Sequence, residues 1–336
     1  MSRIVGTRSE VIKSNELHEE LTSNDSRLIL IEKNDNTIYA FYIENGRLAN
    51  VYSIVRDSDE DKIILSRVIN VKNDIGAVFV KLDENTDAFC KITNVPDRYK
   101  PIKQGDLLPV KIISDSQKGK RISVTAKVGK KHLPFGYEHL SAYNVLYEPE
   151  NGLWAFICKR LCIDEIGSLL TESEAIYNEL SEYTDKIKLY NDDKISLNSL
   201  YSLKTKLNDA LCPKIYLKCG AYLIINHTEA LTVIDVNSGK KISKTQSSDD
   251  NNLNINIEAA EEIAFQMKLR NISGMILVDF INMENEEAKD TLIKKMTEFT
   301  EIDKVTTKVI DITPLGIMEI TRQKTDKPIS ELNIEL

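Results

Sequence analysis

Two short apolar segments that each end in an aspartate constrain the fold more than any other feature of the sequence. Leu231–Asp235 reads Leu-Thr-Val-Ile-Asp, and Met275–Asp279 reads Met-Ile-Leu-Val-Asp. A polar loop and an amphipathic segment with helical spacing, Ile255–Leu269, lie between them. A strand–helix–strand crossover sets its two strands parallel in one sheet. We therefore expect Asp235 and Asp279 at the carboxyl edge of neighbouring parallel strands, with their carboxylates about 5 Å apart.

Two carboxylates at that distance repel each other unless a cation lies between them, and an apolar strand disfavours an unpaired charge. Ligand sites in open α/β sheets lie at the carboxyl ends of strands. Two oxygen ligands with open positions suit Mg²⁺ or Mn²⁺, because water and phosphate oxygens complete the shell. The alternative is that each aspartate only caps a strand or a helix. The matched contexts favour a metal site held by Asp235 and Asp279.

Composition limits the kinds of protein that can carry such a site. With 336 residues, 42% of them hydrophobic and 29% charged, the chain has room for two or three folded modules. A net charge of −8 argues against overall positive potential as the means of binding RNA, so any contact has to be local. No signal peptide or membrane span is recognisable, and we expect a cytoplasmic protein. The five cysteines form no Cys-x-x-Cys pair, so we expect reduced thiols and no structural zinc.

The first 128 residues have the pattern of β-structure in two modules. Three strand-like segments separated by turn signals, at 27–33, 37–43 and 48–56, predict a meander within a module of residues 1–57. Five more short segments rich in β-branched and aromatic residues follow within residues 58–128. The common arrangement of five such strands is the OB-fold barrel.

The rest of the chain changes from irregular to alternating structure. Residues 129–213 begin with a segment interrupted by proline and glycine and continue with two expected helices, 163–183 and 196–211, around a short strand. From 214 to 336 strands alternate with helices, which predicts a largely parallel or mixed sheet covered by helices. The expected fold class is therefore α/β, more fully an α+β chain of several modules.

Motifs in this last module resemble the catalytic region of the ribonuclease E/G family, in the same order and spacing. They are Glu229–Gly239 (EALTVIDVNSG), Asn256–Ala264 (NIEAAEEIA), Lys268–Gly274 (KLRNISG), Ile276–Met283 (ILVDFINM) and Gly316–Gln323 (GIMEITRQ). The resemblance implies a deoxyribonuclease-I-like catalytic subdomain in which Asp235 and Asp279 bind Mg²⁺ and Asn237 forms a hydrogen bond near the scissile phosphate. It extends to the N-terminal modules, which look like an RNase-H-like part with an inserted S1-type OB-fold.

The resemblance also implies RNA contacts in the barrel. Phe79 and Phe89 stand where the family stacks bases on phenylalanines. Stacking on an aromatic ring is worth about 1–3 kcal/mol per base, whichever base it is. Positive charge on an adjoining turn comes from Lys118, Lys120 and Arg121. The alternatives are that Phe79 belongs to the barrel core and that the basic turn is an ordinary solvated hairpin.

Further basic residues near the aspartates are candidates for phosphate contact. Lys240 and Lys241 follow Asn237 in the polar loop, where each phosphate contact would add a salt-sensitive attraction. The alternative is a polar loop without a ligand. Arg322 either neutralises substrate or braces the sheet, whereas we expect Arg270 to be structural.

The resemblance implies a metal-dependent endoribonuclease that hydrolyses single-stranded RNA to 5′-phosphate and 3′-hydroxyl products, in RNA processing or decay. One alternative is a catalytically inactive RNA-binding protein of the same fold, and the presence of Asp235, Asn237 and Asp279 together argues against it. Another is a phosphodiesterase acting on DNA or small nucleotides, which would have no need for the barrel.

Three departures from the family pattern limit what can be carried over. The cysteine pair with which longer relatives link subunits through zinc is absent, so zinc-linked assembly is not expected, and a homo-oligomer stays open. Asn282 replaces the second aspartate of the family's Asp-Phe-Ile-Asp-Met motif. Residues 129–213 correspond to a shortened 5′-sensor region, where Lys159 and Arg160 form the compact basic pair. No arginine of the chain is followed by threonine, the pair of the family's sensor, so we expect poor discrimination between 5′-monophosphate and 5′-hydroxyl RNA.

Overall fold

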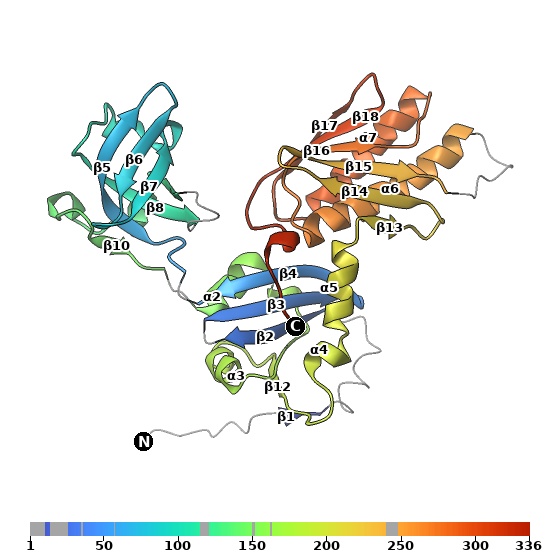
Figure 1. Ribbon diagram of the computed structural model, residues 1–336, viewed down its shortest axis with the longest axis horizontal. Coiled ribbons are helices and arrows are strands. Elements are labelled where there is room, and N and C mark those ends of the chain that lie inside the picture. The colour runs from blue at the N-terminus through green and yellow to red at the C-terminus, as the bar shows by residue number, and fades with distance from the viewer. Residues whose placement is uncertain are drawn as a thin grey trace. The chain divides into compact units, whose positions relative to one another are not determined.

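The structure, a computed structural model, describes residues 11–13, 26–34, 36–56, 58–114, 121–149, 152–161, 163–239 and 248–336. The chain forms two compact units. One consists of Met1–Ile54 and Cys162–Leu336 and the other of Val55–Leu161, so the second is inserted into the sequence of the first (Figure 1). In the part of the chain that is described, no helix is long and apolar enough to cross a membrane.

The inserted unit is built around a closed β-barrel, which confirms the expected OB-like arrangement of five strands. Its strands are β5 (Ile63–Lys72), β6 (Ala77–Lys81), β7 (Asp87–Lys91), β8 (Leu107–Ser114) and β9 (Ile122–Thr125), with β10 (Val145–Tyr147) added beside β5. The barrel closes because β5 pairs with both β6 and β8. Side chains along β6 alternate between an inward set, Val78 and Val80, and an outward set that includes Phe79.

The inserted unit extends beyond residue 128, the expected end of the barrel module. The residues after 128 include the helix α2 (Leu153–Arg160). The unit also contains the 3-10 helices η1 (Ile92–Asn94), η2 (Asp97–Tyr99), η3 (Lys130–His132) and η4 (Tyr137–His139). Val128 and Leu146 pack with Ile63 and Leu65 in a small core of their own. This apolar contact attaches residues that the sequence pattern presents as irregular to the barrel.

The first sheet of the other unit has the strand order β1–β12–β11–β2–β3–β4. These strands are β1 (Val11–Ile12), β2 (Arg27–Asn34), β3 (Thr37–Glu44), β4 (Arg47–Val55), β11 (Ser168–Thr171) and β12 (Ile187–Tyr190). The meander β2–β3–β4 is present as expected, and β11 pairs in parallel with both β2 and β12. The helices α4 (Leu197–Leu200) and α5 (Leu203–Leu211) pack on its core.

One prediction for this sheet was wrong in part. Residues 163–183 are not one helix: they contain η5 (Ile163–Glu165), the strand β11 and the helix α3 (Glu174–Ser181). All four residues of β11 are buried between two parallel strands. A short apolar segment does not by itself distinguish a strand from a helix, and here pairing with distant strands decides the outcome.

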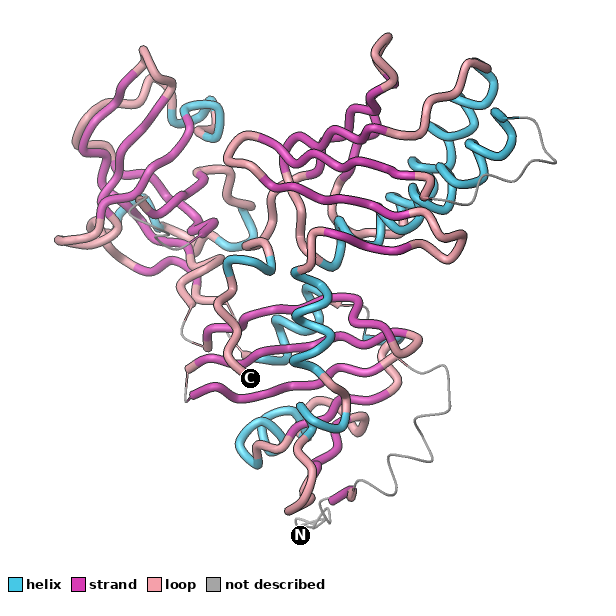
Figure 2. The backbone as a smooth tube through the Cα atoms, turned by 45° about the vertical axis from the view of Figure 1, so that its right-hand side comes forward, coloured by secondary structure: helices cyan, strands magenta, loops and turns pink. Residues whose placement is uncertain are grey.

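The second sheet holds the motifs that end in aspartate, in the strand order β13–β14–β15–β16–β18–β17. Its strands are β13 (Lys214–Tyr216), β14 (Tyr222–His227), β15 (Leu231–Asn237), β16 (Gly274–Asp279), β17 (Thr307–Ile312) and β18 (Ile317–Arg322). The helices α6 (Ser248–Leu269) and α7 (Glu286–Glu301) run along one side of it, and η6 (Ile329–Glu331) lies near the C-terminus (Figure 2). As expected, the sheet is mixed: β15 and β16 are parallel, and the other described pairs are antiparallel.

The helices bury one face of this second sheet and leave the other face open. Ile263 of α6 and Leu292 of α7 share a core with Ile234 and Ile276. Each such fully buried side chain contributes about 1.5–3 kcal/mol relative to exposure. Because strand side chains alternate, the residues between the buried ones point to the open face. The candidate metal ligands of the sheet lie on this face.

Candidate functional site

Asp235 and Asp279 are direct partners in the register of β15 and β16. Asp279 is the last residue of β16, and Asp235 lies two residues before the end of β15. The expectation that they are neighbours on parallel strands at the carboxyl edge is therefore confirmed. Adjacent strands are about 4.8 Å apart, so the two side chains leave the sheet at that spacing.

Both aspartates lie on the open face. Their chain neighbours Ile234 and Val278 are fully buried under the helices, whereas Asp279 is exposed and Asp235 is half-buried. Asn237, two residues after Asp235, lies on the same face, and its Nδ2 donates a hydrogen bond of 2.6 Å to Oδ2 of Asp235. The amide therefore fixes the orientation of one carboxylate and leaves the other oxygen, Oδ1, for a ligand.

The donor chemistry of this group fits a hard divalent cation. Two carboxylates in direct register supply oxygen ligands, the type that Mg²⁺ and Mn²⁺ prefer. Among the described residues, no third histidine, cysteine or carboxylate joins them in a metal-binding group. A metal held by this pair would keep positions for water and for phosphate oxygens, as catalytic sites require.

A residue that the sequence analysis did not single out fixes the segment after Asp279. Asn256 of α6 is fully buried. Its Nδ2 donates to the Ile281 carbonyl at 2.8 Å, and its Oδ1 accepts from the Ile281 N–H at 3.0 Å. The available signal was a polar residue on the apolar side of an amphipathic helix, because such a residue needs a buried partner.

The aromatic residues of the barrel also come together. Phe79 and Phe89 are cross-strand partners of β6 and β7, with ring centroids 5.9 Å apart in an edge-to-face arrangement. Both are half-buried, and the Cζ of Arg121 lies 5.0 Å from the centroid of Phe79. Phe79 thus belongs to the outer surface of the barrel and not to its core. Lys118 and Lys120 lie outside the described residues.

Of the candidate cations Lys240, Lys241 and Arg322, the structure describes Arg322. Lys240 and Lys241 lie outside the described residues. The guanidinium of Arg322 is buried: it binds Oδ2 of Asp303 through Nη2 at 2.7 Å and through Nε at 3.0 Å. Its Nη1 donates to the Ile272 carbonyl at 2.8 Å. The assignment of Arg322 to RNA contact is therefore corrected: its donors brace the sheet, the alternative named above.

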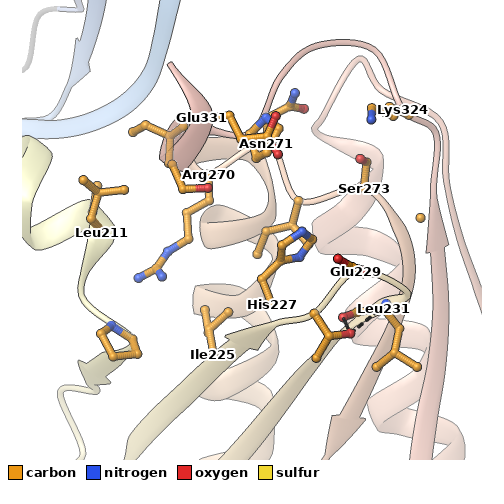
Figure 3. Close-up of a pocket in the computed structure, with 18 of the residues that line it drawn as sticks. Leu211, Ile225, His227, Glu229, Leu231, Arg270, Asn271, Ser273, Lys324 and Glu331 are labelled. Carbon is orange, nitrogen blue, oxygen red and sulfur yellow. Dashed lines mark hydrogen bonds between the residues drawn. The ribbon is translucent and has the colours of Figure 1, made fainter. Parts of the chain in front are cut away.

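Arg270 is structural, as expected. It donates to Oε1 of Gln266 at 2.7 Å and to the Cys212 carbonyl at 2.6 Å, and burial lowers the pKa of its guanidinium. It also lines a cavity of about 370 Å³ together with Leu211, Ile225, His227, Leu231 and Glu331 (Figure 3).

This cavity lies at the wrong end of the strands to belong to the aspartate site. Its lining includes Leu231 and Gly274, the first residues of β15 and β16. Asp235 lies four residues farther along β15, or about 13 Å at the rise of a strand.

The basic pair of the shortened region lies on the helix α2. Lys159 forms an ion pair with Asp61, which also accepts a hydrogen bond of 2.9 Å from Lys111. Burial would raise the pKa of the Asp61 carboxyl, but the hydrogen bonds from Lys159 and Lys111 outweigh it and lower that pKa. Lys159 is thus paired with a carboxylate of the inserted unit itself.

The sequence was compared with known proteins. It is 35% identical over 176 residues to ribonuclease G of Salmonella typhimurium (strain SL1344), which covers 50% of this chain and 36% of that protein. It is 35% identical over 152 residues to the ribonuclease E/G-like protein of Pyropia yezoensis, covering 45% of this chain and 30% of that protein. For ribonuclease E of Synechocystis sp. (strain ATCC 27184 / PCC 6803 / Kazusa) the identity is 39% over 140 residues, 42% of this chain and 21% of that protein.

The matched segment thus spans about a third of the length of these curated relatives, or less. The model of the ribonuclease E/G family matches residues 136–325, more than half of the chain and all of the sheet that carries Asp235 and Asp279. The chain belongs to the ribonuclease E/G family.

Proposed function

We propose that this chain is a metal-dependent endoribonuclease that hydrolyses single-stranded RNA in RNA processing or decay, with Asp235, Asn237 and Asp279 as its catalytic residues. Membership of the family supports the reaction class. The single observation that supports this site best is the direct pairing of Asp235 with Asp279 on the open face of the sheet. The products would be a 5′-phosphate and a 3′-hydroxyl.

Each of the three residues has a role that follows from its position. Asp235 and Asp279 would hold one divalent ion, Mg²⁺ or Mn²⁺, which when bound polarises a phosphoryl oxygen and lowers the pKa of its water. Asn237 orients the Asp235 carboxylate through the bond from Nδ2, and the second N–H of that amide is available to a phosphate oxygen. Asn256 positions the chain after Asp279 and does not touch substrate.

The other modules fit a role in holding RNA. We assign the sheet with the β2–β3–β4 meander to an RNase-H-like part, the barrel to an S1-type module and the second sheet to a deoxyribonuclease-I-like part. On the barrel, the half-exposed pair Phe79 and Phe89 offers a stacking surface, and the guanidinium of Arg121 adds charge beside it. Stacking on such rings is tolerant of sequence, which suits an enzyme that selects single strands.

A cleavage assay separates this proposal from its alternatives. Purified chain would be incubated with end-labelled single-stranded RNA and with DNA of the same sequence, with Mg²⁺ or with a chelator. We expect internal cuts in RNA alone, and none with the chelator. Binding of RNA without cleavage under all metal conditions would support the inactive RNA-binding protein, whereas equal cleavage of DNA would support a general phosphodiesterase.

A further inference from the structure

Two tyrosines and a lysine form a compact group on the open face of the second sheet, at the edge formed by β13 and β14. The Nζ of Lys214 lies 3.9 Å from the ring centroid of Tyr222 and 4.8 Å from that of Tyr216. The two ring centroids are 6.0 Å apart. Tyr216 is 72% exposed and Tyr222 is half-buried. These three residues are called the tyrosine–lysine patch below.

Strand register places this patch beside the aspartate site. Tyr216 is the partner of Tyr222 across β13 and β14, and Tyr222 is the partner of Asn237 across β14 and β15. Residues in register on adjacent antiparallel strands have Cα atoms about 4.5–5.5 Å apart and point to the same face. The ring of Tyr222 is therefore next to the catalytic amide, and that of Tyr216 is one strand farther away.

Charge on the open face favours this side of the site for a polyanion. On the opposite side, Glu319 of β18 and Asp311 of β17 are both exposed and are direct partners in register. Their carboxylates repel phosphates. The exposed cation of β17, Lys308, lies opposite Thr321, two residues farther from the edge that holds the aspartates. A strand of RNA that leaves the site over β14 and β13 meets a lysine and two aromatic rings instead.

The hairpin that carries the patch lies close to the segment after β15 and is bonded to α6. Gly239, two residues after Asn237, has a φ of +66°, and a Cβ atom there would lie 2.6 Å from the carbonyl oxygen of Gly220 in the hairpin turn. The neighbouring Cys219 N–H donates to Oε1 of Glu258 on α6 at 3.1 Å. The close approach and the hydrogen bond, together with the strand register, place the patch beside Asn237.

We infer that the tyrosine–lysine patch binds the nucleotides adjacent to the scissile phosphate, with bases stacked on Tyr222 and Tyr216 and a phosphate paired with Lys214. The location of the scissile phosphate in this inference rests on the proposed function. Aromatic rings stack on any base, and a flexible lysine side chain can move its ammonium group from the rings to a phosphate. The competing explanation is a cross-strand pair that only stabilises the edge of the sheet.

The test asks whether removing a base from the RNA and removing a tyrosine ring from the protein affect the same interaction. The full chain carrying Asp235→Asn, in which we expect no cleavage, would be titrated with fluorescent single-stranded RNA that contains one abasic nucleotide at successive positions around a mapped cut. We expect one or two positions on one side of the cut where the abasic nucleotide weakens binding about fivefold or more. In protein that also carries Tyr222→Ala, the abasic nucleotide at those positions should weaken binding no further.

The control variants separate stacking from stability. Tyr222→Phe keeps the ring and should keep the abasic effect, whereas Tyr183→Ala removes an exposed tyrosine two residues after α3 and should leave it unchanged. If Tyr222→Ala does not fold, the same comparison with abasic RNA is made with Tyr216→Ala, which removes a more exposed ring. Abasic effects that are the same with and without the tyrosines would overturn the inference.

The test also remains readable if the proposed function fails, because it measures binding and not cleavage. If the wild-type chain did not cut RNA, the abasic nucleotide would be moved along the whole of a bound oligonucleotide. A coupling to Tyr222 would then support the patch as an RNA site although the nuclease assignment had failed. Absence of any coupling would overturn the patch independently.

Discussion

At the scale of single residues, Arg322 shows how burial separates two roles that a motif leaves open. The sequence presents an arginine at the end of a strand, which suits either a phosphate or a buried carboxylate. The structure engages both ends of its guanidinium with Asp303 and the Ile272 carbonyl. The partner Asp303 lies 19 residues away in the chain, outside the motif, so the pattern around Arg322 could not reveal it.

We expect Arg322→Met to lower the free energy of unfolding by about 3 kcal/mol, because it leaves the partly buried carboxylate of Asp303 without its cationic partner. The affinity of the folded protein for RNA should stay the same. Chemical denaturation and RNA titration of one preparation measure both quantities, with the exposed Lys324→Met as the control. A variant of normal stability that binds RNA more weakly would restore the substrate-contact role.

At the scale of elements, the sequence predicted the structure correctly where the pattern was long and the segments that pack together are close in the chain. The β15–α6–β16 crossover followed from two matched strands and the helix between them, and register then brought Asp235 and Asp279 together. The strand β11 was missed because its four residues become a strand only by pairing with β2 and β12, which are distant in sequence. Asn256 was missed because its partner, the backbone of Ile281, becomes visible only once α6 packs on the sheet.

The link between α6 and the segment after β16 gives a second prediction. Asn256→Leu leaves the N–H and the carbonyl of Ile281, in a partly buried position, without their partner, which should cost about 2–3 kcal/mol of stability. Because the segment follows Asp279 directly, kcat should also fall while KM changes little. Asn252→Leu is the matched control, since Asn252 also donates to this segment, at the Asn282 carbonyl, but from a less buried position. Equal effects of the two variants on kcat would contradict a special role for Asn256.

The docking of α2 onto the barrel predicts a dependence on pH. The pKa of Asp61 is lower in the folded chain than in the unfolded chain, so folding favours its ionised form. This contribution is fully present above the ordinary aspartate pKa of about 3.9 and is lost as the pH falls through the lower, folded value. Asp61→Asn should therefore lower the thermal midpoint at pH 7 and flatten its decline below about pH 4. If the thermal midpoint of Asp61→Asn fell at acid pH as steeply as that of the Asp74→Asn control, the stabilising role assigned to ionised Asp61 would be contradicted.

At the scale of the whole chain, the inserted unit gives a prediction about how the proposed enzyme selects RNA ends. Lys159, one half of the basic pair in the shortened region, is already paired with Asp61. We therefore expect initial cleavage rates on one oligonucleotide to differ less than about threefold between a 5′-monophosphate and a 5′-hydroxyl end. A tenfold advantage for the monophosphate, about 1.4 kcal/mol of transition-state binding, would show that a sensor exists elsewhere in the chain.

The central claim is that Asp235 and Asp279 together hold the metal on which cleavage depends, and one measurement tests it most directly. Single-turnover cleavage of bound single-stranded RNA would be followed over a Mg²⁺ titration for Asp235→Asn, Asp279→Asn and the control Asp290→Asn, which makes the same charge change on an exposed part of α7. We expect each of the first two variants to lose at least about 100-fold in rate, or about 2.7 kcal/mol of barrier, with RNA affinity and folding nearly unchanged. The control should match the wild type. Wild-type rates for Asp235→Asn and Asp279→Asn at saturating Mg²⁺ would contradict the claim.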